Sequence, residues 1–274
     1  MISRILAWLT DGAHWQGSDG ITRRLLEHLA YSLTTVVVAA LIAIPLGLYI
    51  GHTGRGRVFV VNLVGAARAI PSLGLLFIAV LWLGPRLNGD IAFLAPAGIV
   101  LVVLAIPPIL SGAYAGVESV EPNARDAAKG MGMRGGQVVR QVELPCALPL
   151  IMSGIRSGTL QVIATATIAA VVGLGGLGRF LIDGLAVRDT PQTASGAILV
   201  ALLALAVDMV LALVQRCMVS RGLTGRYRTV QVFDHDADSK RHQRRRFFSE
   251  GTGRAWDRPT RPLNPPDRPE SSTP

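Results

Sequence analysis

Long apolar stretches alternate with short polar segments along most of this chain. Five stretches approach or exceed the roughly 20 residues that an α-helix needs to cross a lipid bilayer. Few charged residues interrupt them. The pattern therefore predicts an all-α integral membrane protein with about five transmembrane helices, over residues 29–50, 58–83, 91–117, 147–172 and 195–213.

Three of these stretches contain a charged side chain: Arg68 in the second, Arg156 in the fourth and Asp208 in the fifth. A charge within a bilayer is costly and by default indicates a function. The two arginines could instead extend toward the inner membrane face or pair within the bundle. Asp208 lies in the middle of its stretch and is expected to pair inside the bundle. A direct role of these residues in ligand passage stays open as the alternative.

Small residues and prolines add two expectations. Glycine pairs four residues apart are typical of membrane helices that pack closely, and they occur at Gly47/Gly51, Gly112/Gly116 and Gly154/Gly158. Prolines also occur within the apolar stretches, where irregular backbone is tolerated only if it faces protein or a cavity. Pro71 and Ser72 are therefore candidate residues of a pathway or a gate.

The composition agrees with a membrane protein, since half of the residues are apolar and 16% are charged, against about 25% charged in soluble domains. The net charge of +9 is unevenly placed: residues 1–215 carry 14 basic and 11 acidic residues, and residues 216–274 carry 13 and 7. The nearly balanced first part excludes a uniformly basic nucleic-acid binder. Two cysteines exclude a disulfide scaffold.

The ends of the chain differ from its middle. Residues 1–28 are predicted to be an interfacial segment, since Trp8 and Trp15 suit a position among lipid headgroups. Residues 29–220 are the predicted transmembrane domain. Residues 221–274 are rich in Arg, Asp, Ser and Pro and are predicted to form a disordered, basic cytoplasmic tail. Such a tail is either simply solvated, which we favour, or lies on anionic membrane lipid.

The orientation follows from the basic residues of the short loops. If the C-terminus is cytoplasmic, the inside loops carry six Lys and Arg residues and the outside loops three, as the positive-inside rule requires. Five crossings then place the N-terminus outside. The loop at residues 118–146 is consequently predicted to be cytoplasmic.

This loop is the most informative segment. Pro122 suits the first turn of a helix, and Gly132 suits a left-handed C-terminal stop. A second short helix is expected over residues 134–142, with Pro145 ending it. The loop is therefore predicted to be an ordered helix–turn–helix that another protein binds.

An Asp-Ala-Ala triplet is followed in this loop by three residues, a glycine, nine residues and Val-x-Leu-Pro. The spacing resembles the EAA loop of binding-protein-dependent ABC importer permeases, with Asp in place of Glu and Val in place of Ile. In that family the loop docks into a groove on the ATPase subunit. The resemblance implies ATPase-coupling roles for Asp126, Ala127, Ala128, Gly130, Gly132, Val142, Leu144 and Pro145.

Other segments resemble the osmoprotectant subgroup of this family, which imports glycine betaine, carnitine or choline. Arg68 begins the most similar segment, Arg-Ala-Ile-Pro-Ser-Leu-Gly-Leu-Leu. Gly135 and Gly136 depart from the relatives, which carry larger residues there. Each glycine lowers helix propensity by about 1 kcal/mol relative to alanine. The second coupling helix is therefore expected to be short or mobile.

The resemblance implies a permease subunit of an ATP-driven importer in the cell membrane. Its implied partners are ABC ATPase subunits, a second permease subunit (identical or a sister chain) and an extracytoplasmic substrate-binding protein. The chain contains no Gly-x4-Gly-Lys-Ser/Thr motif for ATP phosphates, so ATP hydrolysis is expected in a separate subunit. No cofactor and no metal are predicted.

Several alternatives are weighed against this interpretation. Within the same class, the substrate could be an amino acid such as methionine, or a sulfonate. An ion-coupled secondary transporter could use Arg68 and Asp208 as a charge relay, although internal repeats are not evident. A membrane enzyme would need a metal or nucleophile constellation. Gly173, Gly175 and Gly178 match Gly-x-Gly-x-x-Gly, but a membrane span precedes them where a dinucleotide site needs a strand.

Overall fold

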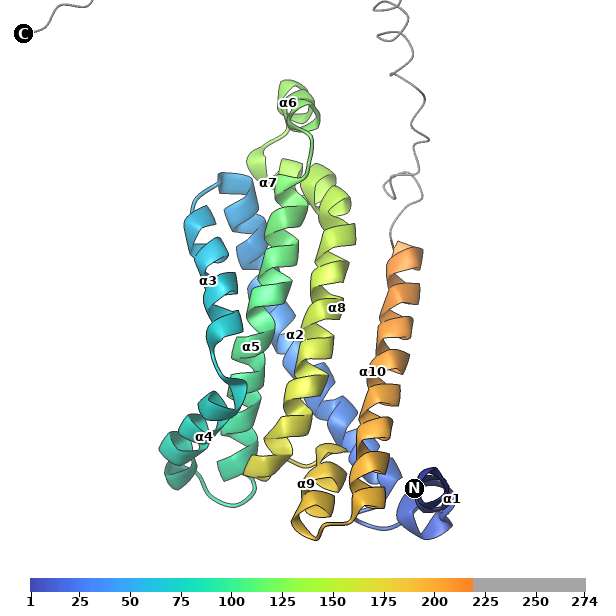
Figure 1. Ribbon diagram of the computed structural model, residues 1–274. Coiled ribbons are helices and arrows are strands. Elements are labelled where there is room, and N and C mark those ends of the chain that lie inside the picture. Colours follow the sequence, from blue (N-terminus) through green and yellow to red (C-terminus); the bar gives the residue numbers. More distant parts are fainter. Residues whose placement is uncertain (219–274) are drawn as a thin grey trace, which may run out of the picture. The chain divides into compact units, whose positions relative to one another are not determined.

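The computed structural model describes residues 1–218, and every regular element in that range is a helix (Figure 1). Four segments are long and apolar enough to cross a membrane. They are α2 (Ile21–Thr53), α5 (Ile91–Glu118), the segment that contains α8 (Leu144–Ala169) and α10 (Thr190–Met218). The predicted all-helical membrane fold is confirmed. The predicted tail at 221–274, and the last two residues of the predicted transmembrane domain, lie outside the described residues.

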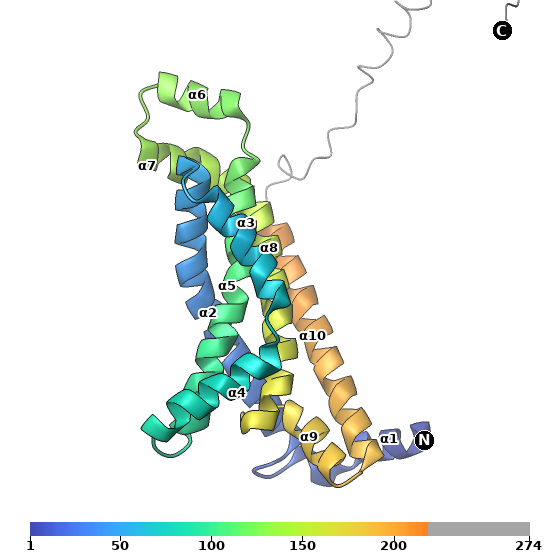
Figure 2. The ribbon, with the colours of Figure 1, turned by 60° about the vertical axis from the view of Figure 1, so that its left-hand side comes forward.

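The second predicted stretch is formed by two helices, α3 (Arg57–Ala69) and α4 (Ser72–Leu83). The break falls at Ile70 and Pro71. Ile70 is extended, with φ −75° and ψ 122°, as expected for a residue that precedes proline. Figure 2 shows α4 turned away from the direction of α3. Two shorter helices thus replace the second expected transmembrane helix. The other four expected crossings are made by long helical segments.

Helix α5 lies between α2 and α8, and glycines allow the close packing of all three. A Cβ atom on Gly47 of α2 would lie 2.5 Å from the Cβ of Ala113. A Cβ atom on Gly112 of α5 would lie 2.8 Å from the Cα of Gly154 on α8. Distances this short leave no room for a side chain, so the predicted packing role of these glycines is confirmed.

The segment that leads into α8 differs from the prediction that Pro145 ends a helix. α7 (Gly135–Val138), the π-helical turn η3 (Val139–Glu143) and α8 follow one another without a break. The Leu144 N–H donates to the carbonyl of Val139, five residues back. Pro145 comes directly after this wide turn, in the first turn of α8, where its missing N–H is tolerated. The proline therefore begins a membrane helix and does not end the second short helix of the loop.

The N-terminal residues lie at the end of the bundle opposite α6 (Pro122–Gly130) (Figure 2). α1 (Ile2–Thr10) lies beside α10 and contacts α9 (Gly178–Ala186) through Trp8, and η1 (Gly12–Trp15) contacts α2. The Trp8 ring stacks on His14, with 4.3 Å between ring centroids, and meets the edge of Phe180 at 5.5 Å. Its place among lipid headgroups stays a prediction.

Candidate functional site

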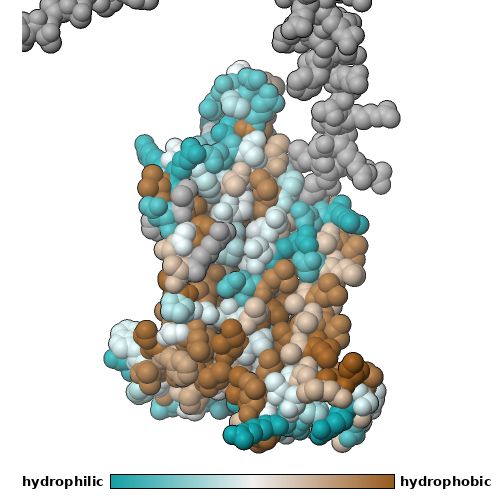
Figure 3. All heavy atoms as spheres, in the orientation of Figure 1, coloured by the Kyte–Doolittle hydropathy of each residue, from teal (hydrophilic) through white to brown (hydrophobic). Residues whose placement is uncertain are grey.

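Helix α6 projects from one end of the bundle and presents a hydrophilic surface (Figures 1 and 3). Pro122 occupies its first position, as predicted. Asp126 and Ala127 are exposed, whereas Ala128 is buried. The helix contacts α7 and η3 below it. Only part of the Asp-Ala-Ala triplet is thus available to a partner protein, and the second alanine anchors α6 to the bundle.

Gly132 ends the α6 segment in the predicted left-handed conformation, with φ +84°. Its N–H donates to the Lys129 carbonyl at 2.9 Å, and the Met133 N–H donates to the Ala128 carbonyl at 3.2 Å. These two bonds are the Schellman arrangement, which satisfies the last carbonyls of a helix and requires a positive φ. The glycine therefore sets the direction in which the chain returns to the bundle. Gly130 is the exposed last residue of α6.

The second half of the EAA-like motif lies within the bundle, away from α6. Val142 is in the π-helical turn, and Leu144 and Pro145 are in the first turn of α8, all three half-buried. Leu144 packs against a cluster that includes Ala113 and Val117 of α5. The motif thus combines an exposed helix with the segment that attaches it to the membrane helices.

A buried carboxylate connects these two halves. Glu143, the last residue of η3, is 1% exposed. Its Oε1 lies 3.0 Å from Nε of Arg125 on α6. Its Oε2 lies 2.9 Å from Nδ1 of His52 at the end of α2. Arg125 also donates to the Val117 carbonyl at the end of α5. The Val-x-Leu-Pro pattern does not single out Glu143, which occupies its variable position, and no local pattern places Arg125 or His52 beside it.

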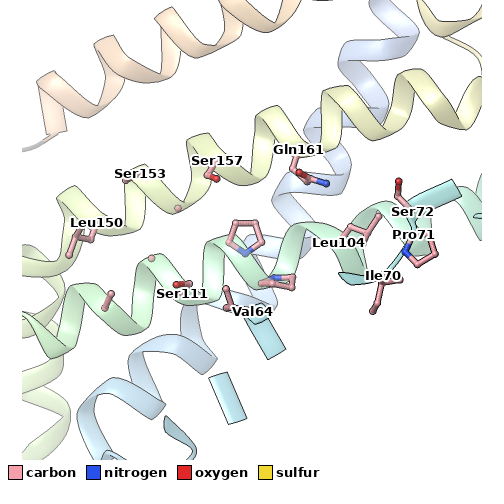
Figure 4. Close-up of a pocket in the computed structure, with 15 residues that line it drawn as sticks. Val64, Ile70, Pro71, Ser72, Leu104, Ser111, Leu150, Ser153, Ser157 and Gln161 are labelled. Carbon is pink, nitrogen blue, oxygen red and sulfur yellow. The ribbon is translucent and has the colours of Figure 1, made fainter. Parts of the chain in front are cut away.

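A cleft of about 730 Å³ opens along α5 and α8, close to the break between α3 and α4 (Figure 4). Pro71 and Ser72, the candidate gate residues, both line it. The polar groups of its wall are uncharged and come from Ser72, Ser111, Ser153, Ser157 and Gln161. Among the described residues of the lining, none is charged or aromatic. Arg68 lies in α3, but its side chain is not among those that the structure describes.

Arg156 and Asp208, the other two candidate pathway residues, form a pair away from the described lining of this cleft. The guanidinium donates two hydrogen bonds to the carboxylate, Nε to Oδ1 at 2.9 Å and Nη2 to Oδ2 at 2.8 Å. Gln215 extends the contact by donating to the Pro149 carbonyl at 3.1 Å. The predicted pairing of Asp208 inside the bundle is observed, and it joins α8 to α10.

The glycine-rich turn after α8 is packed against the start of α2. The Gly176 N–H donates to Oε2 of Glu27 at 3.1 Å. A Cβ on Gly175 would lie 2.6 Å from the same oxygen, and one on Gly176 would lie 3.0 Å from Nδ1 of His28. The glycines thus permit close contact between two membrane segments. This accounts for the Gly-x-Gly-x-x-Gly match without a dinucleotide site.

Comparisons with known proteins agree with this arrangement. The family described as binding-protein-dependent transport system inner membrane component matches residues 43–221. The glycine betaine/carnitine/choline transport system permease protein OpuCB of Bacillus subtilis strain 168 is 36% identical over 201 residues, 73% of this chain and 88% of the relative. The choline transport system permease protein OpuBB of the same organism is 35% identical over 199 residues, 72% of this chain and 88% of the relative.

The fold also matches that of a solved transporter. An inward-facing structure of the MetNI methionine ABC transporter superposes with a TM-score of 0.62 at 20% sequence identity, over 73% of this chain and 96% of the matched chain. At this level of identity the likeness shows the fold alone. The family match covers most of the described chain, including the EAA-like segment and both walls of the cleft. The chain therefore belongs to the family of binding-protein-dependent transport system inner membrane components.

Proposed function

We propose that this chain is the permease subunit of an ATP-driven importer for osmoprotectants such as glycine betaine, carnitine or choline. The observation that carries the proposal is the 36% identity to OpuCB, which extends over 88% of that relative. The name of OpuCB states the three substrates, and that of OpuBB states choline. Sequence identity does not by itself distinguish glycine betaine, carnitine and choline, so the experiment below measures uptake of each.

In this proposal α6 is the element that docks on the ATPase subunit. It is exposed, it carries the Asp-Ala-Ala triplet, and it lies at one end of the bundle (Figure 2). Helix α10 ends at Met218, on the side of the bundle where α6 lies, and α1 lies at the opposite end. The end with α6 is then cytoplasmic, so the chain beyond Met218 begins on the cytoplasmic side and the N-terminus is outside. This orientation agrees with the basic residues of the loops.

In this proposal the cleft between α5 and α8 forms one half of the substrate pathway. A second permease subunit supplies the other half. Hydroxyl and amide groups give a small polar solute hydrogen bonds without a fixed charge to hold it. A quaternary ammonium ion is recognised tightly by stacked aromatic rings, which are missing from the described lining. Selection of the substrate is thereby assigned to an extracytoplasmic binding protein, and the permease passes on what it receives.

Two alternatives are less well supported. The likeness to a methionine transporter supports the fold and says nothing of the substrate, because the identity is only 20%. The ion-coupled alternative uses Arg68 and Asp208 as a charge relay, whereas the Asp208 carboxylate is bonded to Arg156 and lies outside the described lining of the cleft. Membrane lipid is expected around α10, where Leu202, Leu205 and Met209 are exposed.

The test is uptake in the source cells with the gene deleted and restored. Restored cells are expected to accumulate radiolabelled glycine betaine, carnitine or choline, and the deletion strain is not. Accumulation should cease when ATP is depleted and persist when the proton gradient alone is dissipated. Purification of the tagged chain should recover an ABC ATPase. Uptake of methionine alone, or uptake that follows the proton gradient, would contradict the proposal.

A further inference from the structure

We infer that Glu143 is a positioning residue that holds the coupling helix α6 in a fixed relation to α2 and α8, so that a movement of α6 moves the membrane helices. The inference rests on the proposed function, since it assumes that α6 receives the movement from an ATPase. It concerns the three side chains of Glu143, Arg125 and His52, which we call the Glu143 triad.

The two oxygens of one carboxylate serve two different elements. Oε1 faces Arg125 of α6, at 3.0 Å from Nε, and Oε2 faces His52 of α2, at 2.9 Å from Nδ1. Glu143 itself lies one residue before α8. The end of α2, which is distant in the chain, thus meets α6 and the start of α8 at one buried group. Arg125 adds the end of α5 through its bond to the Val117 carbonyl.

Burial makes these contacts difficult to separate. Glu143 is 1% exposed, and the side chains of Arg125 and His52 are 23% and 25% exposed. A buried carboxylate that loses its partners is left without the solvation that water would give it. The groups of the triad are therefore favoured to move together. An exposed pair at the same end of the bundle, Arg57 with Glu118 at 3.2 Å, has side chains 67% and 44% exposed and lacks this restraint.

The local backbone fits the same role. Glu143 closes the π-helical turn of residues 139–143, and such turns occur often at functional sites. Gly135, at the start of α7, lies beside the imidazole: a Cβ there would be in ordinary contact with Nε2 of His52, at 3.4 Å. Gly135 thus adjoins the histidine of the triad. A buried charged contact at the end of a π-helical turn, next to the first residue of α8, is suited to passing on a displacement.

A purely structural role is the competing explanation, and the number of substrate molecules imported per ATP hydrolysed separates the two. Loss of a structural contact lowers the amount of assembled complex, so that uptake and ATP hydrolysis fall in proportion. Loss of a positioning contact leaves an assembled complex that hydrolyses ATP and imports little. The ratio is therefore the readout, measured in proteoliposomes with the complex purified from the source cells.

Four variants carry the experiment. His52→Ala removes one arm of the triad, and His52→Asn keeps a donor near the position of Nδ1. Glu143→Gln removes the charge, and Arg57→Gln breaks the exposed pair as the matched control. We expect uptake per ATP to fall at least fivefold in His52→Ala and Glu143→Gln, and to stay within twofold of wild type in His52→Asn and Arg57→Gln.

The inference is overturned if His52→Ala imports as many substrate molecules per ATP as the wild type. This holds whether uptake and ATP hydrolysis are both normal or both fall in proportion. If Glu143→Gln fails to assemble, the two His52 variants decide alone, because that side chain is partly exposed. Failure of the proposed function looks different: wild-type proteoliposomes would then show no ATP-driven uptake of glycine betaine, carnitine or choline. A wild-type complex that imports one of them, beside variants with an unchanged ratio, contradicts the inference only.

Discussion

At the scale of single residues, Gly132 shows how one backbone angle shapes the coupling segment. No atom outside its own neighbourhood lies within 4 Å of the position where a Cβ would be. A substitution there therefore meets no steric clash with the rest of the protein. Its effect comes from φ alone, which is +84° and which β-branched residues strongly disfavour.

We predict that Gly132→Val abolishes uptake and co-purification of the ATPase while insertion into the membrane is normal. The left-handed conformation costs an ordinary residue about 1–2 kcal/mol, so the Schellman turn opens and α6 loses its direction. Gly132→Asn is expected to retain most activity, because asparagine tolerates this conformation. Gly136→Ala, which has equal space but an ordinary φ, is the control. ATPase recovery at the wild-type level with Gly132→Val would contradict the prediction.

At the scale of elements, the pair of Arg156 and Asp208 is the main polar contact between α8 and α10. Both side chains are about one-third exposed in the isolated chain, at 32% and 28%, on helices that cross the membrane. Removing one partner leaves the other charged and unpaired in a medium without water, whereas replacing both with apolar residues of similar volume leaves no charge.

This difference gives the second prediction. Asp208→Ala is expected to lower the melting temperature of the purified complex, measured in detergent, and to reduce its yield. The double variant Arg156→Met with Asp208→Leu is expected to recover both and to retain ATP-driven uptake. Normal stability combined with lost uptake in the double variant would show that the charges take part in transport, as the ion-coupled alternative requires.

The helices themselves could be predicted from the sequence because their signals are local. Apolar length located the four long membrane helices, but it predicted one helix over residues 58–83, which Ile70 and Pro71 divide into α3 and α4. The interpretation of Pro145 failed because a proline ends a helix or begins one according to the turn that precedes it. No residue pattern at 139–143 predicts a π-helical turn. The Glu143 triad joins residues 52, 125 and 143 through tertiary contacts, which one sequence without an alignment does not reveal.

At the scale of the whole described chain, the functional features lie in a definite order along the bundle. The exposed helix α6 and the Glu143 triad are at one end, and α1 and α9 are at the other (Figure 2). The polar cleft extends along α5 and α8, and Ser111, Ser153 and Ser157 of these helices line it (Figure 4). If this cleft is half of the pathway, it contains water in the working transporter, and α10 faces lipid.

Cysteine labelling tests that difference between the two surfaces. In a background with Cys146→Ser and Cys217→Ser, Ser157→Cys places a thiol in the cleft, and Leu205→Cys places one on the exposed apolar face of α10. A positively charged, membrane-impermeant methanethiosulfonate reacts with thiolates, which form in water and not in lipid. We expect it to reduce uptake at least tenfold in Ser157→Cys and to leave Leu205→Cys unchanged. Failure of the reagent to label Ser157→Cys, with uptake unchanged as in Leu205→Cys, would mean that the cleft is filled by lipid or by a packed partner, and the pathway would then have to run elsewhere.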